Sequence, residues 1–368
     1  MFSTPYPFVF LAFTLILSLP LIFILMPHFL PPKHVQISLS DELDDLTLFR
    51  RAILASSSSS SSSFPSFLHR QSSISKPKIA FLFLIDSDIH FSPLWELFFH
   101  NHHNLFNVYI HGDPSRKIPL TGIFSGREIV SRPTERGSPT LISAERRLLA
   151  TALIDDPLNM YFALISPSCI PLHSFPYIYR ILFPAPIPRL HKMISFIEII
   201  ANETIFPERY NARGKDVMVP EVPYHKFRGG SQFFVLARNH ALMVIQDHRL
   251  WRKFRLPCIN WDSCYPEEHY FSTLLSMEDP AGCSHFTLTR VNWTGSFEGH
   301  PHTYKQHDIS PELIYHLRQS NSTHEYLFAR KFSPDCLSRL MNISETDLSL
   351  LFKDESQTLR YMAPKSCV

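Results

Sequence analysis

Two adjacent carboxylates and a histidine, Glu267, Glu268 and His269, follow a proline and open an apolar run in the second half of the chain. The spacing of the apolar residues over 270–275 predicts a helix with one buried face, with the three residues in its first turn. Acidic side chains are favoured there by the helix dipole, so a solvated helix start is the plain interpretation. The chemical interpretation is general base catalysis, which requires a carboxylate fixed beside a cleft.

The elements that must position these residues indicate an α/β domain. The continuous apolar run 79–85 predicts a strand buried on both faces, and 108–111 and 161–165 predict two more strands. Helices are predicted between them at 93–99 and 143–154. Strands that alternate with helices imply a mostly parallel sheet flanked by helices.

The ends of these strands predict where a ligand binds, because ligands of such sheets bind beyond the carboxyl ends of the strands. That edge carries Asp86, the segment 111–113 and the segment 166–169.

The second half continues the pattern less regularly. Strands are predicted at 232–237, 288–293 and 327–332. Helices are predicted at 239–248, with Asn239 as the capping residue, and at 334–341.

The composition fits a folded chain without a nucleic-acid partner. Its 368 residues carry a net charge of only +2. Aromatic residues make up 13% of the chain, with 31 phenylalanines and only 10 glycines, which is typical of a large packed core.

The six cysteines permit disulfides, but none has the CxxC spacing of a zinc ribbon. The sequence leaves their connectivity open, and the short loop between Cys258 and Cys264 is the first pairing to expect.

The amino terminus predicts a membrane anchor. Residues 8–26 contain no charged side chain and are long enough to cross a bilayer, with 1–7 as a short cytoplasmic tail. Because 18–20 interrupt the run, a cleaved signal peptide is the alternative, although it lacks the usual basic start and small-residue cleavage site.

Residues beyond the anchor are expected on the luminal side, because the chain contains four glycosylation sequons, at Asn202, Asn292, Asn321 and Asn342. A flexible stem is predicted over 27–76, which is rich in proline and contains the serine run 56–63. The folded domain is expected over 77–345, followed by a tail over 346–368.

Four segments resemble a known family in their order and spacing. They are 93–99 with 108–111, then 143–149 with 164–172, then 230–234 with 267–270, and finally Trp293, 300–301 and 328–332. Over residues 78–342 the chain resembles the plant members of the core-2/I-branching β-1,6-N-acetylglucosaminyltransferase family.

The resemblance implies a GT-A-like α/β fold in a single-pass type II Golgi membrane protein. It implies an inverting glycosyltransferase that moves a sugar, N-acetylglucosamine by the family name, from a UDP-sugar to a glycan or glycoprotein acceptor. It implies no metal ion and no other cofactor.

Site residues follow from the same resemblance. Glu268 stands where the family has its catalytic base, Lys331 where a lysine contacts the donor diphosphate, and Trp293 where a tryptophan borders the active site. Without a metal, fixed cations must stabilise the charge that grows on the leaving UDP, and Arg330 and Lys331 are suited to this. Taken alone, Arg330 and Lys331 also fit an exposed basic pair, and Trp293 fits a core position equally well.

The remaining pocket residues are expected beside these. His111 and Gly112, at a strand end, are expected to line the nucleotide pocket, although His111 alone would be a structural loop residue. Glu267 and His269 are expected to border the acceptor.

The chain departs from the family pattern at three positions near the expected site. Glu267 replaces an aspartate, Arg136 replaces a tryptophan before Gly137, and Phe233 replaces a tryptophan after Gln232. A cysteine that often precedes the 328–332 motif is also absent. These changes bear on substrate specificity and on one expected disulfide.

Two metal-binding patterns are set aside. Asp86 and Asp88 have the spacing of a metal motif but follow the first strand, whereas GT-A enzymes carry that motif later, near 166–168, which has no carboxylate. The histidine-rich run 100–103 fits the loop at a helix end.

Two other functions compete with glycosyl transfer. One is a membrane-anchored carbohydrate-binding protein without turnover, which would need neither Glu268 nor Lys331. The other is a glycoside hydrolase that uses Glu267 and Glu268. Adjacent helical residues point about 100° apart, which fits poorly with two carboxylates facing one bond from opposite sides.

Overall fold

The structure, a computed structural model, describes residues 35–61, 76–184, 193–296 and 299–346 and, before them, Thr14, Ile16 and Ser18. Residues 37–368 form one unit and residues 1–36 another. The anchor expected over 8–26 and the tail expected over 346–368 lie outside the described residues, apart from Thr14, Ile16, Ser18 and Thr346. Within the described part, the structure contains no helix with the length and apolar character needed to cross a membrane.

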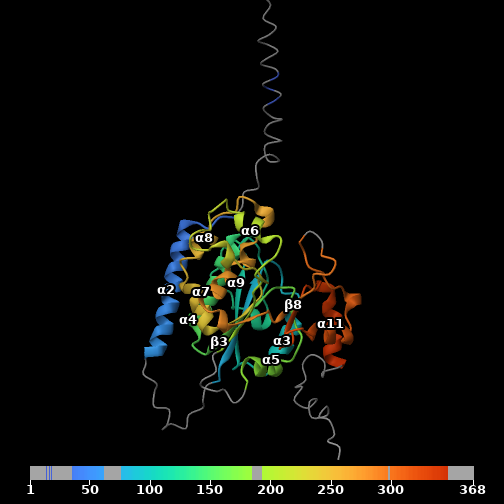
Figure 1. The fold of residues 1–368 in the computed structure, drawn as a ribbon. Coiled ribbons are helices and arrows are strands. Elements are labelled where there is room, and N and C mark those ends of the chain that lie inside the picture. The colour runs from blue at the N-terminus through green and yellow to red at the C-terminus, as the bar shows by residue number, and fades with distance from the viewer. Residues whose placement is uncertain are drawn as a thin grey trace, which may run out of the picture. The chain divides into compact units, whose positions relative to one another are not determined.

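A six-stranded sheet forms the centre of the second unit (Figure 1). Its strands lie in the order β2 (Phe106–Gly112), β1 (Lys78–Ile85), β3 (Asn159–Ile165), β6 (Val235–Ala237), β5 (Ser195–Glu198) and β7 (Cys283–His285). β1 runs parallel to both β2 and β3, and β5 runs parallel to β7. Only β6 runs antiparallel to its neighbours in this sheet as described. The mostly parallel sheet is confirmed.

A second, three-stranded sheet joins distant parts of the chain. Here β9 (Phe328–Arg330) pairs antiparallel with β4 (Ile170–Pro171) and parallel with β8 (Thr289–Val291). Ile170 lies opposite Ala329, and Val291 lies opposite Arg330. This pairing brings the 328–332 motif beside the segment that follows β3.

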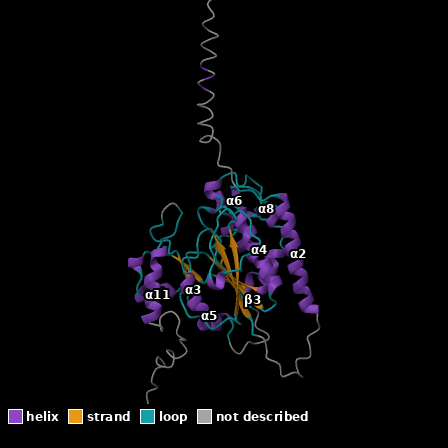
Figure 2. Cartoon of the chain, turned by 180° about the vertical axis from the view of Figure 1, so that it is seen from behind, coloured by secondary structure: helices purple, strands orange, loops and turns teal. Residues whose placement is uncertain are grey.

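Helices cover both faces of the central sheet (Figures 1 and 2). One side carries α2 (Leu39–Ser61), α4 (Pro139–Asp155) and α7 (Arg238–Gln246), and the other carries α3 (Ser92–Phe99), α5 (Phe175–Leu182) and α11 (Leu337–Thr346). The shorter helices α6 (Phe206–Asn211), α8 (Trp251–Phe254), α9 (Tyr270–Glu278) and α10 (Pro311–Arg318) complete the domain.

Aromatic side chains fill the core between β1 and α3, as the composition predicts. The ring of Phe81 on β1 lies 4.9 Å from that of Phe99 and 6.1 Å from that of Trp95. The indole nitrogen of Trp95 donates to the carbonyl of Cys169 at 3.2 Å, so this buried ring has its polar group satisfied.

The predicted flexible stem is wrong for residues 39–61, which form α2 and pack on α4 and α7. Phe49 and Ala52 are buried there, and the Asp45 carboxylate lies 2.5 Å from the guanidinium of Arg147 on α4. Other acidic residues of α2 also pair with arginines of the domain, Asp41 and Asp44 with Arg132 and Glu42 with Arg255.

The start of α7 also differs from the prediction. The helix begins at Arg238, and its capping residue is Ala237, so Asn239 does not cap it. The physical reason is that β6 runs directly into α7, so Ala237 takes the extended capping position and Asn239 is already the second residue of the helix.

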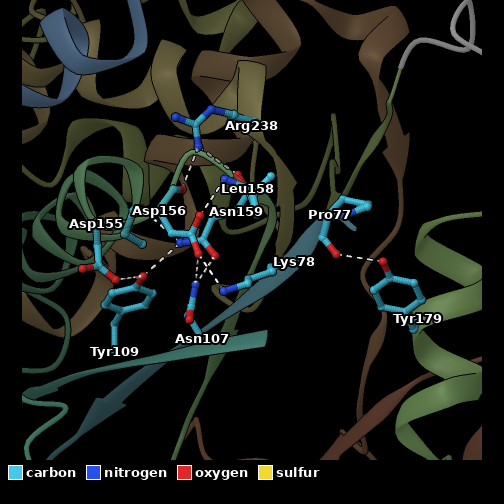
Figure 3. Close-up of polar contacts among 11 residues, drawn as sticks. Pro77, Lys78, Asn107, Tyr109, Asp155, Asp156, Leu158, Asn159, Tyr179 and Arg238 are labelled. Atoms are coloured by element: carbon cyan, nitrogen blue, oxygen red, sulfur yellow. Dashed lines mark hydrogen bonds and ion pairs between the residues drawn. The ribbon is translucent and has the colours of Figure 1, made fainter. Parts of the chain in front are cut away.

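A polar cluster ties together the amino-terminal ends of β1, β2 and β3 (Figure 3). Asp156 lies 2.8 Å from the Lys78 ammonium and accepts a hydrogen bond from Asn107 at 3.0 Å. The Asn159 amide donates to the Tyr109 hydroxyl at 2.9 Å. These bonds hold together the amino-terminal edge of the sheet. The opposite edge, at the carboxyl ends of the strands, is not occupied by this cluster.

Candidate active site

A cleft of about 1510 Å³ opens at the carboxyl-terminal edge of β1 and β3. Its lining includes Asp86 after β1, Asp113 after β2 and the segment Ser166–Ser168 after β3. The edge predicted for the site therefore carries a cleft, and its role as the site stays a prediction. Other elements contribute 205–206, 208–209, 230–233, 262–263, Tyr265 and 267–268 to the lining.

The carboxylate pair is presented by a short turn before α9 rather than by the first turn of that helix. Glu267 and Glu268 lie in the 3-10 turn η4 (Pro266–Glu268), and His269 is the residue before α9. Tyr265 precedes the turn in a left-handed conformation, with φ of 39°. Because the helix starts later than predicted, the side chains of the pair point in different directions from those of an α-helical turn.

Glu268 lines the cleft, and its side chain is 29% exposed. Its Oε2 lies 2.5 Å from Nη1 of Arg209 on α6. No described residue forms a hydrogen bond with its Oε1. This arrangement suits a carboxylate that removes a proton from a group bound in the cleft.

Glu267 has a different environment from its neighbour. It is buried, and its Oε1 accepts a hydrogen bond from the backbone amide of Gly137 at 2.9 Å. Burial, and next the charge of Glu268, raise the pKa of Glu267 to about 7. Glu267 therefore anchors the loop before α4 at the floor of the cleft, and the two carboxylates do not form an equivalent pair.

His269 packs behind Glu268 rather than at the cleft surface, which corrects the expectation that it borders the acceptor. It is buried against Phe227, whose ring lies 4.4 Å away, and its Nδ1 lies 2.8 Å from the Arg228 carbonyl oxygen. Burial lowers the pKa of His269 to about 3, so the ring is neutral at physiological pH.

Arg330 and Lys331 line the cleft at the end of β9. The guanidinium of Arg330 lies over the ring of Phe233. Burial, and next the charges of Arg330 and Arg136, lower the pKa of Lys331. Clustered like charges of this kind favour the binding of an anion, which relieves their repulsion.

The expectation for His111 and Gly112 is wrong, because neither lines the cleft. His111 is fully buried, and its Nε2 accepts a hydrogen bond from the backbone amide of Arg132 at 3.2 Å. Burial lowers its pKa to about 4. His111 therefore holds the loop beside β2, and Asp113 is the residue of this segment that reaches the cleft.

Trp293 lines the cleft and is 55% exposed, so it does not fill the core. It follows β8, and two further aromatic residues, Tyr265 and Phe233, also line the cleft. An exposed indole in a cleft can stack on the apolar face of a sugar ring.

Arg136, one of the departures from the family pattern, also lines the cleft. Its Nη2 donates to the Gly299 carbonyl at 3.0 Å, and its Nη1 lies 2.9 Å from Nε2 of His300. Its guanidinium lies 5.6 Å from the centre of the Tyr265 ring. Arg136 thus joins the loop before α4 to the loop after β8 across one side of the cleft.

Arg209 is the principal site residue that sequence reasoning missed. It lies on α6, a helix that the sequence did not predict, and belongs to none of the motifs. Only the contact between α6 and the turn η4 brings it to Glu268, so no local signal could have found it.

The disulfide between Cys258 and Cys264 is present, as expected. The loop that it closes is held to the end of α6, because the amides of Ile259 and Asn260 both donate to the Ala212 carbonyl, at 2.8 and 2.9 Å. Among the sequons, Asn202, Asn321 and Asn342 are exposed, whereas Asn292 is half-buried and accepts a hydrogen bond from the Thr294 amide. Glycosylation at all four stays a prediction.

Neither pattern set aside as a metal motif forms a ligand cluster in the described part of the chain. Asp86 lines the cleft, but Asp88 does not. No group of three or more His, Cys, Asp or Glu side chains among the described residues, the run 100–103 included, is placed to hold a metal ion.

Comparison with known proteins supports the resemblance seen in the sequence. The family model of the core-2/I-branching enzymes matches residues 79–318. A rice protein (Oryza sativa subsp. japonica), described as glycosyltransferase BC10, is 28% identical over 334 residues, which cover 77% of this chain and 79% of the relative. The region that the family model matches contains Glu268 and Arg209 and ends before β9.

Proposed function

The chain belongs to the core-2/I-branching enzyme family and is a glycosyltransferase, and on that premise we propose that it transfers a sugar from a UDP-sugar to a glycan or glycoprotein hydroxyl with inversion. Glu268 removes the proton of the attacking hydroxyl in a single displacement. Arg330 and Lys331 offset the negative charge that develops on the leaving UDP. The family name suggests N-acetylglucosamine as the transferred sugar.

One observation carries this proposal. Glu268, from the turn before α9, and Arg330 and Lys331, from the end of β9, line the same cleft although they are far apart in the sequence. An inverting displacement at the sugar carbon needs a base on the side of the attacking hydroxyl and positive charge on the side of the leaving diphosphate. A cleft lined by one carboxylate and two cations can supply both.

We propose that the transfer requires no metal ion. The segment after β3, where related folds carry metal-binding carboxylates, presents Ser166 and Ser168 to the cleft. The fixed cations Arg330 and Lys331 supply the positive charge that a metal would otherwise provide.

We also propose that the protein acts in the Golgi lumen, anchored by residues 8–26. Exposed sequons at Asn202 and Asn321 and the disulfide of Cys258 with Cys264 are compatible with an oxidising luminal compartment.

The test is UDP release from a panel of UDP-sugars by the purified full-length chain, with EDTA present, for wild type and Glu268→Gln. Release of UDP from one donor that persists in EDTA and falls at least 100-fold in Glu268→Gln supports the proposal. Loss of activity in EDTA that Mn²⁺ restores overturns the metal-free mechanism. Failure of every UDP-sugar to bind overturns the choice of donor class.

A further inference from the structure

The carboxylate of Glu268 is held by one specific cation, Arg209 of α6. Nη1 of Arg209 lies 2.5 Å from Oε2 of Glu268, and both side chains are mostly shielded from solvent, at 20% and 29% exposure. At this depth a charge-assisted hydrogen bond is stronger than on an open surface, because water screens it less.

A buried histidine fixes the direction of Arg209. The Arg228 carbonyl, which can only accept, lies 2.8 Å from Nδ1 of His269, so that nitrogen carries the proton. The neutral ring then offers a lone pair at Nε2, which lies 3.3 Å from Nη1 of Arg209. The same Arg209 nitrogen thus spans from His269 to Glu268, and the histidine of the Glu-Glu-His motif acts through the arginine.

The other contacts of Arg209 restrict it further. Its guanidinium lies over the ring of Tyr265, 5.1 Å from the ring centre. The helix that carries it ends at Asn211, and the carbonyl of the next residue, Ala212, is bound by the disulfide loop 258–264. The tip of Arg209 is therefore held by the turn that carries the base, and its backbone is held by the loop before that turn.

Several other titratable groups face Glu268. Glu267 from the same turn and Glu198 from β5 are carboxyl groups whose pKa burial raises, whereas Arg330 at the end of β9 is a cation. Arg209 is the cation that touches the Glu268 carboxylate directly, so its hydrogen bond is the contact that can fix the direction of this side chain.

We propose that Arg209 is a positioning residue for the base. It binds Oε2 of Glu268, fixes the direction of the carboxylate in the cleft, and leaves Oε1 for the acceptor hydroxyl. In the reaction, the hydroxyl proton moves to Glu268 as the acceptor oxygen bonds to the sugar carbon and the bond from that carbon to UDP breaks. This role rests on the proposed function of Glu268 as the base.

The first experiment measures kcat and the donor KM for UDP release with the donor found above, in wild type, Arg209→Met and Arg209→Lys. In Arg209→Met we expect kcat to fall about 10-fold or more, because the Glu268 carboxylate loses the charge-assisted hydrogen bond that orients it. The donor KM stays within about twofold of wild type. Arg209→Lys restores most of kcat.

A second readout needs no turnover. Isothermal titration measures the affinity for UDP, and Arg209→Met should bind UDP within about twofold of wild type, because Arg209 contacts the base and not the donor. Arg249→Met, which breaks an exposed pair with Glu278 at 2.5 Å, leaves both readouts unchanged.

An unchanged kcat in a folded Arg209→Met protein overturns the proposal. So does a loss of UDP affinity, or an increase in donor KM without a fall in kcat, since Arg209 would then contact the donor. Failure of the base assignment is distinguished by Glu268→Gln: if that variant keeps its activity, Glu268 is not the base, whatever Arg209 does to its direction.

Discussion

The guanidinium carbon of Arg330 lies 4.2 Å from the centre of the Phe233 ring, and both side chains line the cleft. The sequence resemblance predicts a tryptophan at position 233. Phe233 supplies an aromatic face to Arg330 with a smaller ring. A cation held on an aromatic face in a partly closed site gains about 0.5–2 kcal/mol from the contact.

We predict that Phe233→Leu weakens UDP binding by about threefold to 30-fold, because Arg330 loses the face that orients it. Phe233→Trp retains or strengthens binding. Isothermal titration with UDP measures both variants. Equal affinity in Phe233→Leu and wild type would show that Arg330 needs no aromatic support.

Lys331 is predicted to bind the donor diphosphate. Lys331→Met should reduce UDP affinity by about 10-fold or more, because a partly buried charge-assisted contact contributes about 1.5–3 kcal/mol. Uridine lacks the diphosphate, so its weaker binding should be the same in the variant and in wild type. The exposed Lys226 provides the matched control, and Lys226→Met should bind UDP as wild type does.

Asp45 tests whether α2 belongs to the catalytic domain. Asp45→Ala leaves Arg147 buried without its carboxylate, and we expect a loss of about 3 kcal/mol in the free energy of unfolding. Asp44→Ala, which removes a 66% exposed partner of Arg132, should cost less than about 1 kcal/mol. Urea denaturation compares the two, and similar small losses would argue that α2 contributes little.

Glu267 gives a prediction about pH. Its folded-state pKa is raised from 4.5 to about 7 by burial, so its contribution to stability is fully present below pH 4.5 and is lost as the pH rises through 7. The loss is about 3 kcal/mol by the linkage relation. Glu267→Gln can still accept from the Gly137 amide, and its stability should fall less than that of wild type between pH 4.5 and 8. Parallel pH dependence in the two proteins, measured by denaturation, would contradict the raised pKa.

The sequence by itself determined the α/β class, the mostly parallel sheet and the edge at which the cleft lies. It could do so because buried strands show as continuous apolar runs, as 79–85 does, and because the carboxyl ends of parallel strands meet at one edge. Motif order also identified Glu268, Arg330, Lys331 and Trp293 as cleft residues. The disulfide of Cys258 with Cys264 was predictable because the loop between them is short.

Tertiary structure decided what local patterns could not express. Residues 39–61 have the composition of a spacer, yet they form α2, which is held to the domain by ion pairs with Arg147 and Arg132. Local patterns could not show this, because these arginines lie far along the chain. His111 lies near the end of a strand as expected, but its side chain is buried, and it accepts a hydrogen bond from the backbone amide of Arg132.

The roles within the Glu-Glu-His motif were likewise settled by distant residues. The backbone amide of Gly137 donates a hydrogen bond to the carboxylate of Glu267, and Arg209 binds the carboxylate of Glu268. The pKa and direction of a side chain depend on the charges and dipoles that surround it in space, and adjacent residues in the chain can face entirely different surroundings.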